Sequence, residues 1–169
     1  IFTLADYVRA QIMVPIQAEA LKHAVRERRN ILVAGGTSSG KTTLANALLA
    51  EIADCDERVI LIEDTRELQC AAVDCVALRT RPWNTGHPGG IATVHANSAH
   101  AALYRIEQLI QESVSVIPRR LIAEAIDLVV FIAGRGSSRR IETIAEVTGL
   151  DANGDYVVNA LSLPQLQHS

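Results

Sequence analysis

The sequence predicts an α/β fold with a mainly parallel central sheet, helices on both faces and a C-terminal antiparallel hairpin. Short apolar runs, such as residues 30–35 and 58–64, alternate along the chain with amphipathic helical segments. These runs are apolar on consecutive residues, which is typical of parallel strands that are covered on both faces. Near the C-terminus the apolar residues instead alternate with period two, and this indicates paired antiparallel strands.

Residues 1–29 are predicted to form two helices ahead of the first strand. Thr3 can cap a helix over residues 4–10, with Asp6 at the capping-box position. Pro15 opens a second helix that extends to about Arg29. The chain starts at isoleucine rather than methionine, so we expect it to be part of a longer protein, with residues 1–29 a linker remnant.

The main domain is expected over residues 30–161, with a tail over 162–169. Its predicted elements follow one another as strand 30–35, helix 42–53, strands 58–64, 73–78 and 90–96, a long helix capped by Asn97 or Ser98, helix 119–126 and strand 127–134. Residues 140–147 and 155–161 then form the hairpin around the turn "DANGD".

Composition narrows the class of protein. With 49% hydrophobic and 21% charged residues, the chain has ordinary globular composition, which argues against disorder. A net charge of -3 gives no reason to propose nucleic acid as a main ligand, so we infer no direct nucleic-acid binding. The longest apolar run, residues 128–133, is too short to span a bilayer. The three cysteines have no metal or redox spacing, which fits a reducing cytoplasm.

The stretch "GGTSSGKTT" fits the phosphate-loop pattern. Its glycines let the backbone curl so that several N–H groups converge on phosphate oxygens, and the following helix adds its N-terminal partial charge. Lys41 would neutralise the β and γ phosphates, and the Thr42 hydroxyl would bind Mg²⁺. The alternative is a chance glycine turn, but the flanking strand and amphipathic helix favour nucleotide binding. The predicted nucleotide-binding residues are Gly35, Gly36, Thr37, Ser38, Ser39, Gly40, Lys41, Thr42 and Thr43.

Two later segments place chemically active side chains at strand ends. "LIEDTREL" puts Glu63 and Asp64 at the carboxyl end of a strand, where a carboxylate can orient or deprotonate water. An isolated pair of this kind is more commonly a solvated strand end. "TGHPGGIATVHANS" puts His87 in a glycine-proline turn and His95 at the end of the next strand. A lone histidine is usually structural, whereas a second one facing the same edge favours a phosphate sensor.

Together these segments resemble the secretion ATPase family of type II and type IV secretion systems and pilus motors. "GGTSSGKTT" is similar to its Walker A loop, "IEDTREL" to its Asp box and "GHPGGIATVHANSAHAALYRIEQLI" to its His box. The segment "WNTGHPGGIATVHANSA" is similar in sequence to the TrbB-like conjugal-transfer branch, and the resemblance covers about residues 2–161.

The resemblance implies a RecA-like, P-loop ATPase domain of a cytoplasmic, hexameric motor at the inner-membrane face, with ATP and Mg²⁺ as ligands. Such a motor works with inner-membrane channel components, and ATP hydrolysis at subunit interfaces drives substrate transfer or pilus assembly. Glu63 is similar to the glutamate that handles the catalytic water, and Arg66 to the arginine of the same box. His95 is similar to the histidine that reads the γ-phosphate, with His87 in support.

One departure from the family pattern is large. The family has a strand carrying the Walker B glutamate between the Asp and His boxes, whereas only Arg81 and Pro82 lie between Thr80 and Trp83 here. Either the sequence lacks residues that the protein has at this point, or the deletion is real and the domain hydrolyses ATP poorly or not at all. We favour the first explanation, because losing a core strand would expose apolar surface on its neighbours.

Two rival functions and one basic turn stay open. The missing segment motivates a nucleotide-binding scaffold subunit that does not hydrolyse ATP, and the family also includes type II export and pilus-retraction motors. Arg135, Arg139 and Arg140 form a basic turn in "GRGSSRRI", for which a solvated turn is favoured over a nucleotide or intersubunit contact.

Overall fold

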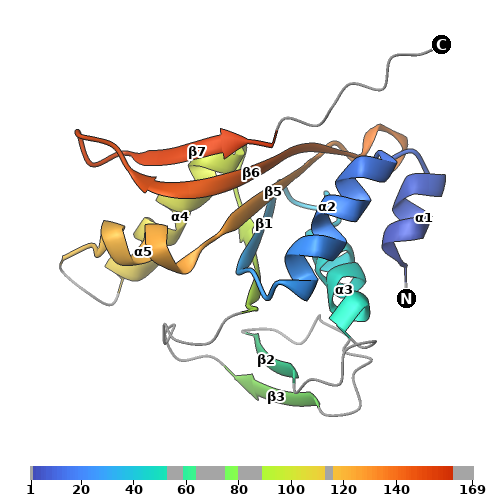
Figure 1. Cartoon of the computed structure of the whole chain (residues 1–169), viewed down its shortest axis with the longest axis horizontal. Coiled ribbons are helices and arrows are strands. Elements are labelled where there is room, and N and C mark those ends of the chain that lie inside the picture. The colour runs from blue at the N-terminus through green and yellow to red at the C-terminus, as the bar shows by residue number, and fades with distance from the viewer. Residues whose placement is uncertain (1, 53–58, 64–74, 80–88, 113–115, 162–169) are drawn as a thin grey trace.

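A five-stranded sheet forms the centre of the molecule (Figure 1). The computed structural model describes residues 2–52, 59–63, 75–79, 89–112 and 116–161. The strand order is β4-β1-β5-β6-β7, with the bounds β1 Ile31–Gly35, β4 Ile91–His95, β5 Leu128–Ala133, β6 Arg140–Leu150 and β7 Tyr156–Ala160. β4, β1 and β5 run parallel, whereas β5, β6 and β7 pair antiparallel.

The described sheet is therefore mixed, and the expectation of a mainly parallel central sheet is not confirmed. β2 (Val59–Glu63) and β3 (Cys75–Arg79), which were expected to extend its parallel part, pair with one another in a separate two-stranded sheet. The β5–β6 and β6–β7 connections are short turns, which permit antiparallel pairing only. The α/β class and the C-terminal hairpin are confirmed.

Helices cover both faces of the five-stranded sheet, as predicted (Figure 1). α1 (Leu4–Arg9), α2 (Pro15–Arg26) and α3 (Lys41–Ile52) lie on one face, and α4 (Ala99–Gln111) and α5 (Arg119–Ala125) on the other. Because successive strand side chains point to opposite faces, Ile31 and Val33 pack with the first group, and Leu32 and Ala34 with the second. Every residue of β1 is buried, which explains its continuous apolar sequence.

The helix ends show how local chemistry sets the boundaries. Thr3 and Asp6 form the predicted capping box at the start of α1. α2 begins at Pro15 as predicted but ends at Arg26, before the expected Arg29, because Arg28 has a left-handed backbone with φ 56°. Among the described helices, none combines the length and the apolar character that a bilayer crossing requires.

Candidate nucleotide site

The predicted phosphate loop lies at the carboxyl ends of three parallel strands. β1 ends at Gly35, residues 36–40 form the loop, and α3 begins at Lys41. In the sheet register Gly35 is opposite His95 of β4 on one side and Ile132 of β5 on the other. Ligand sites of open α/β sheets lie at this kind of edge, so the architecture agrees with the position predicted for the site.

Backbone geometry explains two of the loop's glycines. A Cβ on Gly35 would lie 2.5 Å from the carbonyl oxygen of Ile132, so the close approach of β1 to β5 requires glycine. Gly40 has φ 95°, in the region that glycine alone adopts freely. Ser38 also has a positive φ, 61°, and a non-glycine residue pays about 1 kcal/mol for this conformation.

The side chain of Lys41 is held inside the loop. The residue is 7% exposed, and its Nζ donates a hydrogen bond of 2.8 Å to the carbonyl oxygen of Gly36. Nζ also lies 3.2 Å from Nδ1 of His95, which can accept a hydrogen bond when that nitrogen carries no proton. His95 is otherwise exposed. The structure thus brings the predicted phosphate-binding lysine and the predicted phosphate sensor into direct contact.

Ser39 adds a second buried polar group to the loop. The residue is 2% exposed, and its Oγ is buried without a hydrogen-bond partner in the described part of the chain. A buried hydroxyl without a partner costs about 1–3 kcal/mol, so the unpaired Oγ needs an explanation. An anion held at the start of α3, where the first amide groups of a helix have no carbonyl partners within the helix, would supply acceptors for it. The donors of the loop therefore fit a phosphate-bearing ligand.

An arginine that the sequence left as a solvated turn residue also reaches this loop. Arg139 lies between β5 and β6, and its Nη2 donates to the carbonyl oxygen of Ser38 at 3.4 Å. Its guanidinium atoms lie 3.1–3.3 Å from the position of a Cβ on Gly40. Arg135 and Arg140 are exposed, as a solvated turn requires, whereas Arg139 is half-buried against the loop. The predictive signal was topological: a strand parallel to β1 delivers its following turn to the same edge.

Comparison with known proteins agrees with this geometry. Residues 2–82 match the family model described as type II/IV secretion system protein. The conjugal transfer protein TrbB of Rhizobium radiobacter is 39% identical over 89% of this chain, and a probable TrbB of Sinorhizobium fredii is 38% identical over 96%. This chain is therefore similar in sequence to type II/IV secretion system proteins.

The fold of this chain is also similar to that of a solved protein. The crystal structure of the VirB11 ATPase from the Brucella suis type IV secretion system, in complex with sulphate, superposes with a TM-score of 0.64 at 27% identity. That similarity covers 85% of this chain and 54% of the VirB11 chain. The chain likewise spans 58% and 61% of the two TrbB relatives, so it corresponds to little more than half of each.

The remaining residues predicted for the secretion-family site are less well placed. Glu63 ends β2, as predicted, but β2 belongs to the two-stranded sheet and not to the five-stranded sheet that contains His95. Arg66, His87 and the junction between Thr80 and Trp83 lie outside the described residues. Thr42 and Thr43 occupy the first turn of α3, where the Thr42 hydroxyl was predicted to bind Mg²⁺. Within the described ranges, no cluster of three or more His, Cys, Asp or Glu side chains could hold a metal ion.

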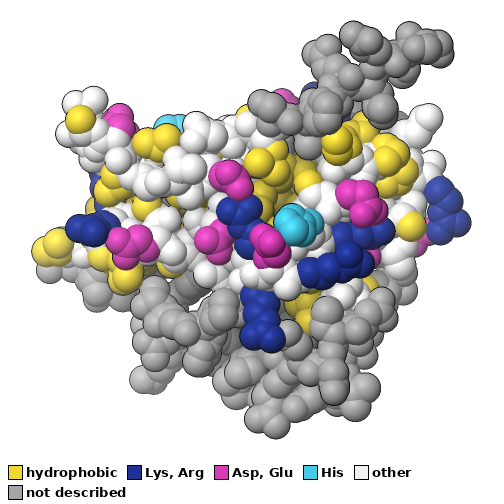
Figure 2. Space-filling view, in the orientation of Figure 1, with side chains coloured by type: hydrophobic (Ala, Val, Ile, Leu, Met, Phe, Trp, Pro, Cys, Tyr) yellow, Lys and Arg dark blue, Asp and Glu magenta, His cyan; other side chains and the backbone are white. Residues whose placement is uncertain are grey.

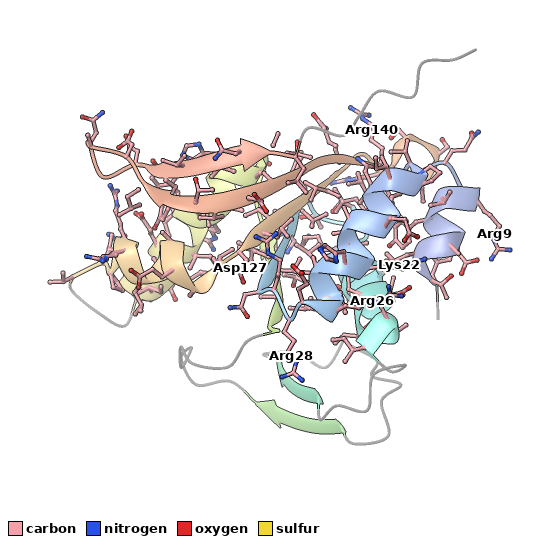
Figure 3. All side chains as sticks on the ribbon, in the orientation of Figure 1. Arg9, Lys22, Arg26, Arg28, Asp127 and Arg140 are labelled. Atoms are coloured by element: carbon pink, nitrogen blue, oxygen red, sulfur yellow. The ribbon has the colours of Figure 1, made fainter. Side chains whose placement is uncertain are left out.

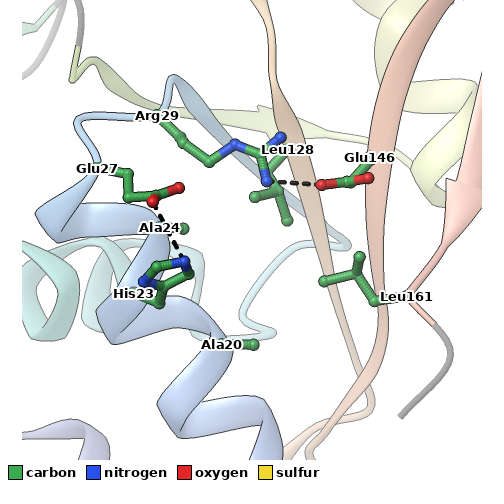
Figure 4. Close-up of a pocket in the computed structure, with 8 residues that line it drawn as sticks. All are labelled: Ala20, His23, Ala24, Glu27, Arg29, Leu128, Glu146 and Leu161. Atoms are coloured by element: carbon green, nitrogen blue, oxygen red, sulfur yellow. Dashed lines mark hydrogen bonds and ion pairs between the residues drawn. The ribbon is translucent and has the colours of Figure 1, made fainter.

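A second hollow, of about 470 Å³, lies away from the phosphate loop (Figure 4). Its lining comes from α2, the first residue of β5 and the facing part of β6. An ion pair of Arg29 with Glu146 at 2.6 Å borders it, as does a contact of 3.3 Å between His23 Nε2 and Glu27. Figure 2 shows acidic, basic and histidine side chains gathered at the centre of this face. Because Leu128 begins β5 whereas the phosphate loop follows the end of β1, the hollow is at the opposite edge of the sheet. It is therefore not the candidate nucleotide site.

Proposed function

We propose that this chain is the ATP-hydrolysing motor domain of a type IV secretion or conjugal transfer system. The observation that carries the proposal is the convergence of the Lys41 ammonium, the Gly36 carbonyl and His95 Nδ1 at the end of β1. A buried lysine charge needs polar partners, and a bound phosphate can take the place of these two contacts. The names of the TrbB and VirB11 relatives supply the biological setting.

Different groups of the loop bind different parts of the ATP phosphates. The amides of residues 36–42 and the start of α3 bind phosphate oxygens, and Lys41 neutralises the β and γ phosphates. Ser39 Oγ, buried and without a partner in the described structure, adds a further polar contact. His95 reads the γ-phosphate from the neighbouring strand end. A VirB11 ATPase to which this chain is similar was solved with sulphate, an anion of the shape and charge type of a phosphate group.

The catalytic assignments extend beyond the loop. Thr42 and phosphate oxygens hold Mg²⁺, which when bound neutralises charge on the phosphates. Glu63 orients the attacking water, Arg66 supports the same step, and His87 supports His95. Hydrolysis occurs at the subunit interfaces of a hexameric ring on the cytoplasmic side of the inner membrane, and moves one domain or subunit against its neighbour. That motion acts on the components of the secretion channel.

The test uses the two lysines of the chain. We expect Lys41→Ala to lower ATP turnover about 100-fold or more, because a single donor to the developing charge has an effect of this size. Lys22→Ala is the matched control, since Lys22 belongs to α2 (Figure 3) and pairs there with Glu19 at 3.0 Å. Phosphate release is measured for both variants in the protein that includes all its domains. Full turnover in Lys41→Ala would refute the proposal.

A second candidate is a nucleotide-binding subunit that scaffolds the assembly without hydrolysing ATP. The specific observation in its favour is that β2, with Glu63 at its end, pairs with β3 and not with the sheet of the phosphate loop. Tight ATP binding without phosphate release would establish this alternative. Phosphate release that depends on Lys41 and Glu63 would exclude it.

A further inference from the structure

One arginine of the turn between β5 and β6, Arg139, contacts the phosphate loop. Because β5 runs parallel to β1 with Ile132 opposite Gly35, residues 134–139 leave the sheet beside residues 36–40. A short 3-10 helix, Gly136–Ser138, directs the chain back so that Arg139 precedes β6. The other residues of the turn are exposed, whereas Arg139 is half-buried.

The contacts of Arg139 run along the loop backbone. Nη2 donates to the Ser38 carbonyl oxygen at 3.4 Å, and a Cβ on Gly40 would lie 3.1 Å from both Cζ and Nε. Ser38 and Gly40 are the two loop residues with positive φ, 61° and 95°. The planar guanidinium therefore covers the part of the loop whose conformation is least favourable by itself.

The position of this side chain is costly. Its Nε is buried without a hydrogen-bond partner in the described structure, and so is the hydroxyl of Tyr7 from α1. The two groups are near enough that the guanidinium acts electrostatically on the Tyr7 hydroxyl. An arginine whose side chain simply extended into solvent from the turn would avoid the cost of an unpaired buried donor. The placement therefore implies a role at the loop.

The helical lead-in holds this arginine in place. Two residues after Arg139, the Ile141 amide donates to the Ile12 carbonyl at 2.7 Å, and the Ile141 carbonyl accepts from Nε2 of Gln17 at 3.3 Å. Gln17 is itself buried. On the other side, a Cβ on Gly134 would lie 2.1 Å from the Ser138 carbonyl oxygen, so the turn is closed tightly behind the arginine.

We propose that Arg139 is a positioning residue of the phosphate loop. It holds the Ser38–Gly40 backbone from the carbonyl side, so that the amide groups stay directed at a phosphate. Its assigned role is to position the loop, because Nη2 donates to a loop carbonyl and Nε is buried against the loop. A lysine cannot replace it, since a point charge lacks the planar fork that spans several backbone atoms. The proposal rests on the phosphate-binding function proposed above.

The test compares Arg139→Ala and Arg139→Lys with Arg140→Ala. Arg140 is the adjacent residue of equal charge, and its side chain is 60% exposed and pairs with Glu142 at 3.5 Å, near the start of α2 (Figure 3). We expect both Arg139 variants to bind ATP and inorganic pyrophosphate about tenfold more weakly, and Arg140→Ala to change by less than about twofold. Amide hydrogen exchange over residues 36–42 of the ligand-free protein should accelerate in the Arg139 variants alone, at an unchanged melting temperature.

Each other outcome overturns the proposal. Wild-type affinity for both ligands in Arg139→Ala excludes a role at the loop. Equal losses of affinity in Arg139→Ala and Arg140→Ala show that only the net charge of the turn matters. Weaker binding of ATP without weaker binding of pyrophosphate indicates a nucleoside contact instead. If the wild-type protein binds neither ligand, the proposed function fails, and unchanged hydrogen exchange in Arg139→Ala then separately rejects the positioning role. If Arg139→Ala does not fold, Arg139→Lys decides by the same measurements.

Discussion

At the residue scale, the buried ammonium group of Lys41 is the main feature of the candidate site. Burying an ammonium group that is 7% exposed costs hydration, which polar contacts offset, and these contacts include the Gly36 carbonyl oxygen and His95 Nδ1. Under the proposed function phosphate oxygens would replace these contacts, because an anion attracts the ammonium more strongly than a neutral carbonyl or an imidazole nitrogen does.

Tyr7 supports a prediction about alkaline pH. Burial raises the pKa of its hydroxyl to about 12, with Arg139 opposing the shift. Below pH 10 the hydroxyl is protonated in both the folded and the unfolded chain, so it adds no pH dependence. Between pH 10 and 12 only the unfolded chain ionises, and the free energy of unfolding therefore falls as the pH rises. With allowance for screening by solvent, we expect Tyr7→Phe to remove about 1 kcal/mol of this loss.

Urea unfolding of the wild type and of Tyr7→Phe at pH 8 and pH 11 measures this difference. Tyr104→Phe serves as a control at pH 8, because the Tyr104 hydroxyl donates to Asp155 at 3.1 Å whereas the Tyr7 hydroxyl has no partner in the described structure. We expect Tyr104→Phe to be destabilised at pH 8 and Tyr7→Phe not to be. Equal losses of stability at pH 11 in Tyr7→Phe and the wild type would contradict the prediction.

At the scale of elements, one arginine joins two helices and the C-terminal hairpin. Arg119 of α5 pairs with the buried Glu107 of α4 at 2.8 Å and donates to the Gly154 carbonyl of the hairpin turn at 3.3 Å. Its guanidinium also lies over the ring of Tyr104, 5.8 Å from the centroid. These contacts keep α4, α5 and the β6–β7 hairpin together on one face of the sheet.

Removing this arginine should loosen all three elements. Arg119→Ala leaves the Glu107 carboxylate buried without its counter-ion, and we expect the melting temperature to fall by about 5 °C or more. Arg120→Ala is the control, because Arg120 forms an exposed ion pair with Glu124 on the same helix and should cost less than about 2 °C. Thermal unfolding followed by circular dichroism checks both values. Similar shifts for the two variants would show that the buried pair does not join the elements.

At the scale of the whole molecule, the sheet ends at a strand that is only partly covered. In the described part of the chain β4 pairs with β1 alone, and its residues Ile91 and Ala92 are half-buried.

The alignments with the two TrbB relatives run over 187 and 199 positions, more than the 169 residues of this chain. Each relative therefore has residues, within the aligned region, that are absent from the sequence of this chain. This agrees with the departure from the family pattern that the sequence shows between the Asp and His boxes.

The junction between Thr80 and Trp83 can be tested in the protein as the organism makes it. Trypsin cuts after Arg79 and Arg105, and Pro82 protects the bond after Arg81, so a real deletion gives one peptide over residues 80–105. We expect this peptide to be absent from a tryptic digest of the natural protein. The peptide over residues 106–119, which trypsin releases at Arg105 and Arg119, is the internal standard. Detection of the 80–105 peptide in equal yield would show that the deletion is real and would favour the non-hydrolysing alternative.

The sequence by itself determined the α/β class, the order of the elements, the Thr3 capping box, the C-terminal hairpin and the place of the phosphate loop. It also placed His95 at the edge of Lys41, because parallel strands end together. These features depend on periodicity, caps and turns, which are properties of neighbouring residues.

Only the tertiary structure decided that the sheet is mixed, that β2 pairs outside it, and that Arg139 rather than Arg135 or Arg140 reaches the loop. The physical reason is that strand pairing and register join residues far apart in the sequence. Ser38 and Arg139 are separated by about a hundred positions, and no local pattern records that their backbones meet at one sheet edge.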